Sequence, residues 1–296
     1  MRLGGEDPSS NFEDRTGQSG GFGGGGGNML GCLLPLVFSR FGIVGVIILL
    51  AGYCALTQLG GGGGVLSGGG STTTAPAPQS SAASRLDPRM KDFLTRVLGS
   101  TEQTWGGIFA KQGRRYTPAV MVAYTGGTQT ECGFGQAAMG PFYCPDDQRI
   151  YIDPAFFNEL SRRFGAPGDF AMAYVIAHEV GHHVQDLDGT LGQAHDVQAR
   201  ASETEGNAVQ VKVELQADCY AGVWAANASD AQGSILEPGD VEEGMRAAEA
   251  IGDDTLQKQS QGYVVPDSFT HGTSAQRVNA LRTGMQSANP AACKNL

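Results

Sequence analysis

The chain has 296 residues, of which 41% are hydrophobic and 45 are glycines. This length allows a full-sized core, while the glycine content indicates that part of the chain lies outside it. A formal net charge of −10, without any Lys/Arg cluster, excludes nucleic acid as an expected partner.

The first 86 residues divide into three non-globular segments. Residues 1–40 are predicted to be disordered, because glycine-rich sequence carries too little apolar surface to offset the entropy of folding. Residues 41–59, "FGIVGVIILLAGYCALTQL", form a nearly uncharged run that can cross a ~30 Å hydrocarbon core as one helix. A cleavable signal peptide is the alternative for this run. Residues 60–86 are a Gly/Ser/Pro-rich linker, and a folded domain is expected over residues 87–296.

Cysteine usage bears on the cellular compartment. Four of the six cysteines lie in the expected folded domain: Cys132, Cys144, Cys219 and Cys293. The short, turn-rich loop between Cys132 and Cys144 favours a local disulfide, and Cys219 is then expected to pair with Cys293. Disulfides indicate an oxidising compartment, so we expect the domain on the extracytoplasmic side of the cell membrane. Four reduced, buried thiols are the alternative.

The folded domain is predicted to be α+β. Strands are expected in "PAVMVAYTG" and "RIYID", and one or two helices at the start of the domain. Further helices are expected over residues 168–186, 207–226, 240–251 and 273–286. The pair Asp240 and Glu243 fits the capping-box pattern of a helix start. Thr273 and Gln276 fit it as well.

A hairpin with an exposed edge is expected between the two strands. Residues 136–143 are compatible with an extended conformation, and the following "PDDQ" is a turn. Candidates for binding a substrate backbone as an added strand are Gln136, Ala137, Ala138, Met139 and Gly140. A tight structural loop is the alternative, given the glycines in "GFGQAAMGP".

The stretch "AYVIAHEVGHHVQDL" holds three of the five histidines. His178 and His182 stand four residues apart, so on a helix their imidazoles project from one face and can bind one metal ion. Glu179 lies on the flank of that face, where it can reach a water without ligating the metal, as H-E-x-x-H hydrolysis requires. A helix with ordinary surface histidines is the alternative.

Catalytic zinc usually takes three protein ligands, so a third ligand is needed. Glu214 and Asp218 in "VELQADCYAGVW" are four residues apart on an expected helix. Glu214 is a candidate ligand, and Asp218 is a candidate acceptor for the second ring N–H of a zinc-bound histidine. A pair of solvated carboxylates is the alternative, but both helices are apolar enough to lie in the interior, where a charge needs a partner.

The remaining histidines are weaker candidates. His271 stands in "PDSFTHGTSAQR", in a loop directly before a helix. There it could donate a hydrogen bond to the oxyanion of a tetrahedral intermediate, with Asp267 as an orienting partner. A histidine that only begins the helix is the alternative. His183 and His195 are expected to be structural or exposed.

Several stretches together resemble the bacterial putative neutral zinc metallopeptidase family: "HEVGHHVQ", "ELQADCYAGVW", "GPFYCPDDQRIYID", "LEPGDVEE" and "PDSFTHGTSAQRV". The resemblance spans almost the whole chain, including "NFEDRTG" near its start. It implies a zincin-like fold and peptidase chemistry with one catalytic Zn²⁺. The order H-E-x-x-H then E-x-x-x-D is also similar to the gluzincins. That similarity carries over three ligands, a base and a supporting carboxylate, namely His178, His182, Glu214, Glu179 and Asp218.

The sequence therefore predicts a membrane-anchored, single-pass zinc peptidase that hydrolyses a peptide or protein substrate, with Glu179 as general base. A membrane-tethered zinc-binding scaffold without catalysis is one alternative, and a metal-dependent hydrolase of a non-peptide substrate is another. A closed structural site would need a fourth protein ligand, for which Cys219 is the nearest candidate. Residues 189–207 form a longer connection than in some gluzincins, and neither their role nor the oligomeric state follows from the sequence.

Overall fold

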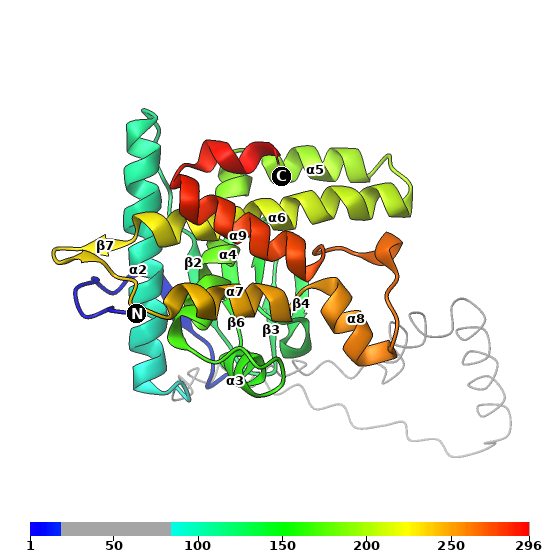
Figure 1. Ribbon diagram of the computed structural model, residues 1–296. Coiled ribbons are helices and arrows are strands. Elements are labelled where there is room, and N and C mark those ends of the chain that lie inside the picture. Colours follow the sequence, from blue (N-terminus) through cyan, green and yellow to red (C-terminus); the bar gives the residue numbers. More distant parts are fainter. Residues whose placement is uncertain (19–83, 296) are drawn as a thin grey trace, which may run out of the picture. The chain divides into compact units, whose positions relative to one another are not determined.

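A mixed four-stranded sheet supports the helices in the computed structural model of the protein, which describes residues 1–18 and 84–295 (Figure 1). The strand order is β1 (Phe12–Asp14), β2 (Val120–Ala123), β6 (Arg149–Ile152) and β5 (Phe142–Cys144). The first three strands are parallel, and β5 runs antiparallel to β6 at one edge. The α+β class and the hairpin edge are therefore confirmed.

Helices form most of the remaining described chain: α2 (Pro88–Lys111), α3 (Ala155–Arg162), α4 (Asp169–Leu187), α5 (Thr190–Gln198), α6 (Glu203–Asn227), α7 (Asp240–Ala250), α8 (Asp253–Gln261) and α9 (Ser274–Ser287). Two short ribbons pair β3 (Gly127–Thr130) with β4 (Gly133–Gln136) and β7 (Ser229–Asp230) with β8 (Gly233–Ser234). Three 3₁₀ turns are η1 (Ala137–Met139), η2 (Pro266–Ser268) and η3 (Pro290–Asn295).

The central strands are buried on both faces. Met121, Ile150 and Ile152 join a large core with α2, α4 and α6. Val122 and Tyr151 point the other way, into a smaller cluster. Tyr151, which lies between Ile150 and Ile152 in sequence, is buried because this second cluster covers the other face of β6.

Helix α4 occupies the middle of the helical layer, where it contacts α2, α6, α7 and the sheet (Figure 1). The four helices expected after residue 168 are confirmed as α4, α6, α7 and α9. The capping box of Thr273 and Gln276 is present. The one expected at Asp240 is absent, because Gly239 occupies the N-cap and Asp240 instead accepts the backbone N–H of Glu237 at 2.6 Å.

Residues 1–18 belong to the folded domain, so the prediction that they are disordered is wrong. Strand β1 pairs with β2 along Phe12 to Asp14. The ammonium group of Met1 lies 2.9 Å from Asp169 and 3.3 Å from Asp240. Composition could not reveal this order, because the partners of Met1 lie 168 and 239 residues away in sequence.

The predicted membrane helix at residues 41–59, the rest of the predicted disordered segment and most of the linker lie outside the described residues. Within residues 1–18 and 84–295, no helix has both the length and the apolar character needed to span a bilayer. The pairing of β1 with β2 nevertheless constrains any attachment to a membrane. Because both strands belong to one sheet, residues 1–18 and the folded domain must lie on the same side. A single crossing by residues 41–59 would separate them, so the predicted single-pass arrangement is not compatible with this sheet.

Both predicted disulfides are present. Cys132 is bonded to Cys144, and Cys219 is bonded to Cys293. The first joins the β3–β4 turn to the edge strand β5, and the second fastens η3 to α6. Since Cys219 is bonded to another sulfur, it is not available as a fourth metal ligand.

Candidate metal centre and cleft

The site forms where α4 and α6 approach closely. At the point of contact, a Cβ built on Gly181 would lie 2.9 Å from the carbonyl oxygen of Ala217 and 3.1 Å from its Cα. A side chain at position 181 would therefore push the two helices apart. The glycine inside "HEVGH" is thus what allows α6 to bring Glu214 up to the histidines of α4.

Three donor atoms converge at this contact. Nε2 of His178 lies 3.1 Å from Nε2 of His182 and 3.1 Å from Oε2 of Glu214. The remaining side of the triangle, from His182 to Glu214, is 3.5 Å. Ligands at about 2.0–2.1 Å from a tetrahedral zinc ion stand about 3.3 Å apart, so the three atoms fit the spacing of a shared zinc ion.

The charges of the cluster also favour a cation. Burial alone would lower the pKa of His178, but Asp218 and Glu214 raise it to about 10. Burial alone would raise the pKa of Glu214, but the two histidines lower it well below its ordinary value. The site thus holds positive charge strongly, either as protons on the imidazoles or as a bound metal ion.

Asp218 fixes the orientation of His178. Its Oδ1 lies 2.7 Å from Nδ1 of the histidine, which leaves Nε2 to face the cluster. The carboxylate is fully buried, and Arg277 of α9 donates to it from Nε at 2.8 Å and from a terminal nitrogen at 2.9 Å. Tyr174, one turn before His178 on α4, donates to the same carboxylate at 2.6 Å.

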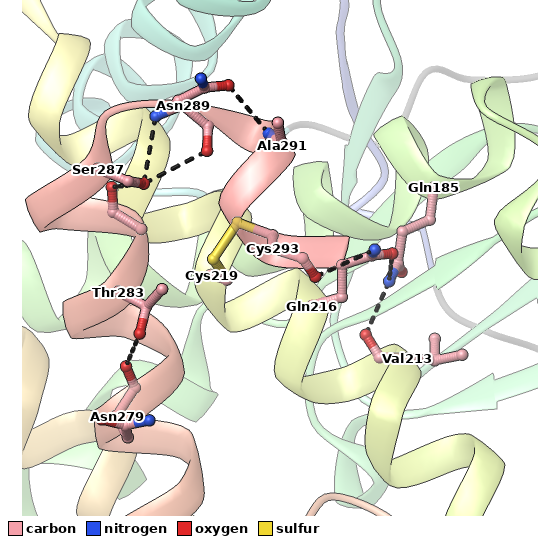
Figure 2. The surroundings of a disulfide bond; sticks show 11 residues. Gln185, Val213, Gln216, Cys219, Asn279, Thr283, Ser287, Asn289, Ala291 and Cys293 are labelled. Carbon is pink, nitrogen blue, oxygen red and sulfur yellow. Dashed lines mark hydrogen bonds between the residues drawn. A yellow bond between two sulfur atoms is a disulfide. The ribbon is translucent and has the colours of Figure 1, made fainter. Parts of the chain in front are cut away.

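Gln185 plays the same part for His182. Its Oε1 lies 2.9 Å from Nδ1 of His182, and its amide nitrogen donates to the carbonyl of Val213 and to Gln216 of α6. Figure 2 shows how this network continues to the disulfide, since Gln216 donates to the carbonyl of Cys293. The second disulfide therefore lies at the end of a hydrogen-bond chain that begins at His182.

Glu179 lies beside the cluster without joining it. Its side chain is buried, and burial raises its pKa, with the two histidines opposing the shift. No hydrogen bond from a described residue reaches its carboxylate. A buried carboxylate whose proton affinity is raised in this way is suited to accept a proton near neutral pH.

A cleft of about 610 Å³ opens over these groups. His178, Glu179, His182 and Glu214 line it together, and residues 137–142 form part of its wall. Helix α5 forms another part with Leu191, Ala194, His195 and Gln198. The connection at residues 189–207, to which the sequence assigns no role, thus supplies a wall of the cleft.

The predicted substrate edge is only partly where it was expected. Ala137, Ala138, Met139 and Gly140 line the cleft. They form the 3₁₀ turn η1 rather than a strand, because the N–H of Gly140 bonds back to the carbonyl of Ala137 and Gly140 adopts a φ of 79°. Gln136 lies away from the cleft lining, where it pairs with Gly127 in the β3–β4 ribbon.

His271 lines the cleft, but its predicted partner is wrong. Its Nδ1 lies 3.2 Å from Oδ1 of Asp253, the first residue of α8. Oδ2 of Asp253 accepts backbone N–H groups from Thr270 and His271, which anchors the loop. Asp267 belongs to a separate pocket, and its carbonyl accepts a hydrogen bond from Asn207.

The two other histidines differ in environment. His183 is fully buried, with Nε2 at 2.7 Å from the carbonyl of Thr117 and Nδ1 at 3.0 Å from the hydroxyl of Tyr143. His183 is therefore structural, as expected. His195 is exposed on α5, as expected, and it faces the cleft.

Comparison with known proteins agrees with this site. The sequence profile of the family described as "Putative neutral zinc metallopeptidase" matches residues 1–296. The chain belongs to this family. It is 45% identical to the "Uncharacterized protein YpfJ" of Escherichia coli K12 over 99% of this chain and 98% of the relative. It is 43% identical to the "Uncharacterized protein Rv2575" of Mycobacterium tuberculosis H37Rv over 60% of this chain and 62% of the relative. No solved structure matches the chain significantly.

The sequence did not single out several residues that contact the cluster of His178, His182 and Glu214 or the cleft beside it. Gln185 stands three residues after His182, and Gln210 stands four residues before Glu214. Helical spacing could have identified both. No local pattern points to Arg277 or Asp253, because each reaches the site from a distant element.

Proposed function

We propose that the protein is a zinc-dependent peptidase that hydrolyses peptide bonds, with Glu179 as general base. The main observation behind the proposal is that one cleft holds both a group of possible metal ligands and a separate buried carboxylate. Three donors converge on one point, while the buried carboxylate of Glu179 lies next to them and stays outside their hydrogen-bond network. A purely structural zinc site has no need of such a free carboxylate.

His178, His182 and Glu214 would hold the zinc ion. When bound, zinc lowers the pKa of a water molecule toward neutrality and polarises the scissile carbonyl. Glu179 accepts the proton of the attacking water, helped by the raised pKa of its carboxyl group. The same carboxyl group then passes the proton to the departing amine, so one residue serves as base and as acid.

The edge strand β5 offers a binding site for the substrate backbone. Within the described residues, β5 pairs with β6 on one side and has no paired strand on the other. Residues 137–141, which lead into β5, line the cleft. A peptide added along this edge would make main-chain hydrogen bonds and pass over the metal cluster. The turn at Gly140 limits how far such pairing extends toward η1.

His271 would stabilise the oxyanion of the tetrahedral intermediate. Asp253 faces Nδ1, so Nε2 is left for a ligand in the cleft. Because the carboxylate accepts from Nδ1–H, Nε2 donates only in the imidazolium form of the ring. Such a donor, aimed at the developing negative charge, would lower the barrier to water attack. Asp253 acts here as the positioning residue, because it holds both the ring and the backbone of His271.

We further propose that the apolar run at residues 41–59 attaches the enzyme to the cell membrane, with the folded domain in an extracytoplasmic compartment. The length and apolarity of the run support the attachment. Two disulfides support the oxidising compartment. Residues 1–18 must then lie in the same compartment as the domain, because β1 is part of its sheet. The proposed attachment is therefore one in which the run enters and leaves the membrane on the same face, without a single crossing.

The decisive test compares the full-length wild type with Glu179→Gln. The variant should keep its zinc, because Glu179 makes no contact with the three donors that an amide would break. Its rate on a peptide library should fall by at least ~10²–10⁴-fold, the usual contribution of a general base. Equal rates with equal zinc would favour the non-catalytic scaffold instead. If the wild type cleaved a non-peptide ester and no peptide, the protein would instead be a metal-dependent hydrolase of a non-peptide substrate.

A further inference from the structure

The carboxylate of Glu214 is held at both of its oxygens by different groups. Oε2 faces Nε2 of His178 at 3.1 Å, on the side of the metal cluster. Oε1 accepts a hydrogen bond of 2.8 Å from the amide nitrogen of Gln210, one turn earlier on α6. Because the residue is buried, water does not compete freely for Oε1.

The orientation of the Gln210 amide is fixed by a second glutamine. Gln198, the last residue of α5, donates to Oε1 of Gln210 at 3.0 Å. The same nitrogen donates to the carbonyl of Gly206 at 3.3 Å. Since a carboxylate and a carbonyl can only accept, the chain of donors runs in one direction, from Gln198 through Gln210 to Glu214.

We propose that Gln210, oriented by Gln198, is a positioning residue that holds Glu214 as a monodentate zinc ligand and so keeps one coordination position open. The inference rests on the proposed function, in which zinc needs three protein ligands and a free position for water. If Oε1 were released, the carboxylate could turn and bind zinc through both oxygens. The free position would then be filled by the protein itself.

This relay, the hydrogen-bond chain from Gln198 through Gln210 to Glu214, gives α5 a second role. The helix lines the cleft with Leu191 and Ala194, has no buried residue, and follows Gly189 at a φ of 75°. Its last side chain sets the amide that holds Glu214. A peptide lying along α5 would therefore contact the same helix that determines how the ligand is presented.

The first test measures the visible absorption of the Co²⁺-substituted full-length protein. Four-coordinate cobalt absorbs more strongly than five-coordinate cobalt. Gln210→Ala should weaken the absorption and lower zinc affinity by about 10–100-fold, as loss of a ligand's hydrogen-bond partner commonly does. A cobalt spectrum identical to that of the wild type would overturn the proposal.

The second test reverses the direction of the relay. Glu at position 198 can only accept, so Gln198→Glu should rotate the Gln210 amide and turn its oxygen toward Glu214. Zinc affinity should then fall more than in Gln198→Ala, although an added negative charge would by itself attract the cation. Gln193→Glu is the matched control, because it adds the same charge to an exposed position of α5.

The two substitutions must also depend on each other. In a Gln210→Ala background, Gln198→Glu should have little further effect on zinc affinity, since its target amide is gone. An undiminished effect in that background would overturn the relay. These measurements use metal binding alone, so they are independent of whether Glu179→Gln abolishes peptide cleavage.

Discussion

Nδ1 of His178 lies 2.7 Å from Oδ1 of Asp218, and the carboxylate is wholly buried behind the cleft. The contact joins α4 to α6 and determines which nitrogen of the ring faces the metal cluster. Arg277 neutralises the carboxylate from α9. Three helices therefore meet at one hydrogen-bonded group directly behind a candidate ligand.

Asp218→Asn should lower zinc affinity by about 10–100-fold. A neutral amide holds the ring of His178 less firmly than a carboxylate does, and it makes Nε2 of that ring a weaker zinc ligand. The change also leaves Arg277 buried opposite a neutral group, so thermal stability should fall. Competition with a chromophoric chelator measures the affinity. Asp196→Asn, at an exposed position of α5, is the control and should behave as wild type. Unchanged affinity in a folded Asp218→Asn protein would remove Asp218 from the site.

The sequence predicted the parts of the site that lie on single helices. The spacing of His178 and His182, and of Glu214 and Asp218, places each pair on one helix face. The sequence could not show which residues of different helices come into contact. The partner of His271 was predicted from within the same loop, as Asp267, whereas the tertiary structure brings Asp253 there from the start of α8.

The fold was predicted least well where local composition and tertiary contacts disagree. Residues 1–18 are mostly polar, yet β1 is ordered by pairing with a strand more than 100 residues away. Residues 137–139 have no sequence feature that forbids a strand, and the turn at Gly140 makes them 3₁₀. With the capping box at Ser202 and Glu205, the helix that carries Glu214 begins at Glu203, four residues before its predicted start at residue 207.

Gly181→Ala should weaken the metal site without changing any ligand. The new Cβ would lie 2.9 Å from the carbonyl oxygen of Ala217, so α4 and α6 must separate by some tenths of an ångström. Zinc affinity and the melting temperature should both fall. Gly192→Ala is the matched control on α5, because no neighbouring atom lies within 4 Å of the position that a Cβ would take there. That control should stabilise the protein by about 0.5–1 kcal/mol in urea denaturation. Equal zinc affinity in the two variants would contradict the role of the close approach.

Glu6 should make the stability of the protein depend on pH. Oε1 of Glu6 and Oδ2 of Asp230 are both buried without hydrogen-bond partners among the described residues. Burial and the charge of Asp230 raise the pKa of Glu6 above its ordinary value of 4.5. The folded state then binds the proton of Glu6 more tightly than the unfolded state. The contribution of this proton to stability is therefore complete below pH 4.5 and is lost as the pH rises through the folded-state pKa of Glu6.

Glu6→Gln removes this ionisation and should raise the melting temperature at pH 7 while having less effect at pH 4. For a domain of this size, each kcal/mol corresponds to about 2–4 °C. Calorimetry at both pH values measures the difference. Glu131→Gln, an exposed carboxylate, is the control and should show no such trend. A larger gain at pH 4 than at pH 7 would contradict the sign derived from Glu6.

The pairing of β1 with β2 predicts that both ends of the chain react from the same side of a membrane. Ser10 and Lys258 are exposed positions on the two sides of the apolar run in sequence. In a background where Cys32 and Cys54 are replaced by serine, Ser10→Cys and Lys258→Cys should be labelled alike by a membrane-impermeant maleimide on intact cells. Opening the membrane with detergent provides the control for total reactive thiol. If one position were labelled on intact cells and the other only after detergent, β1 could not occupy its place beside β2 in the membrane-attached protein.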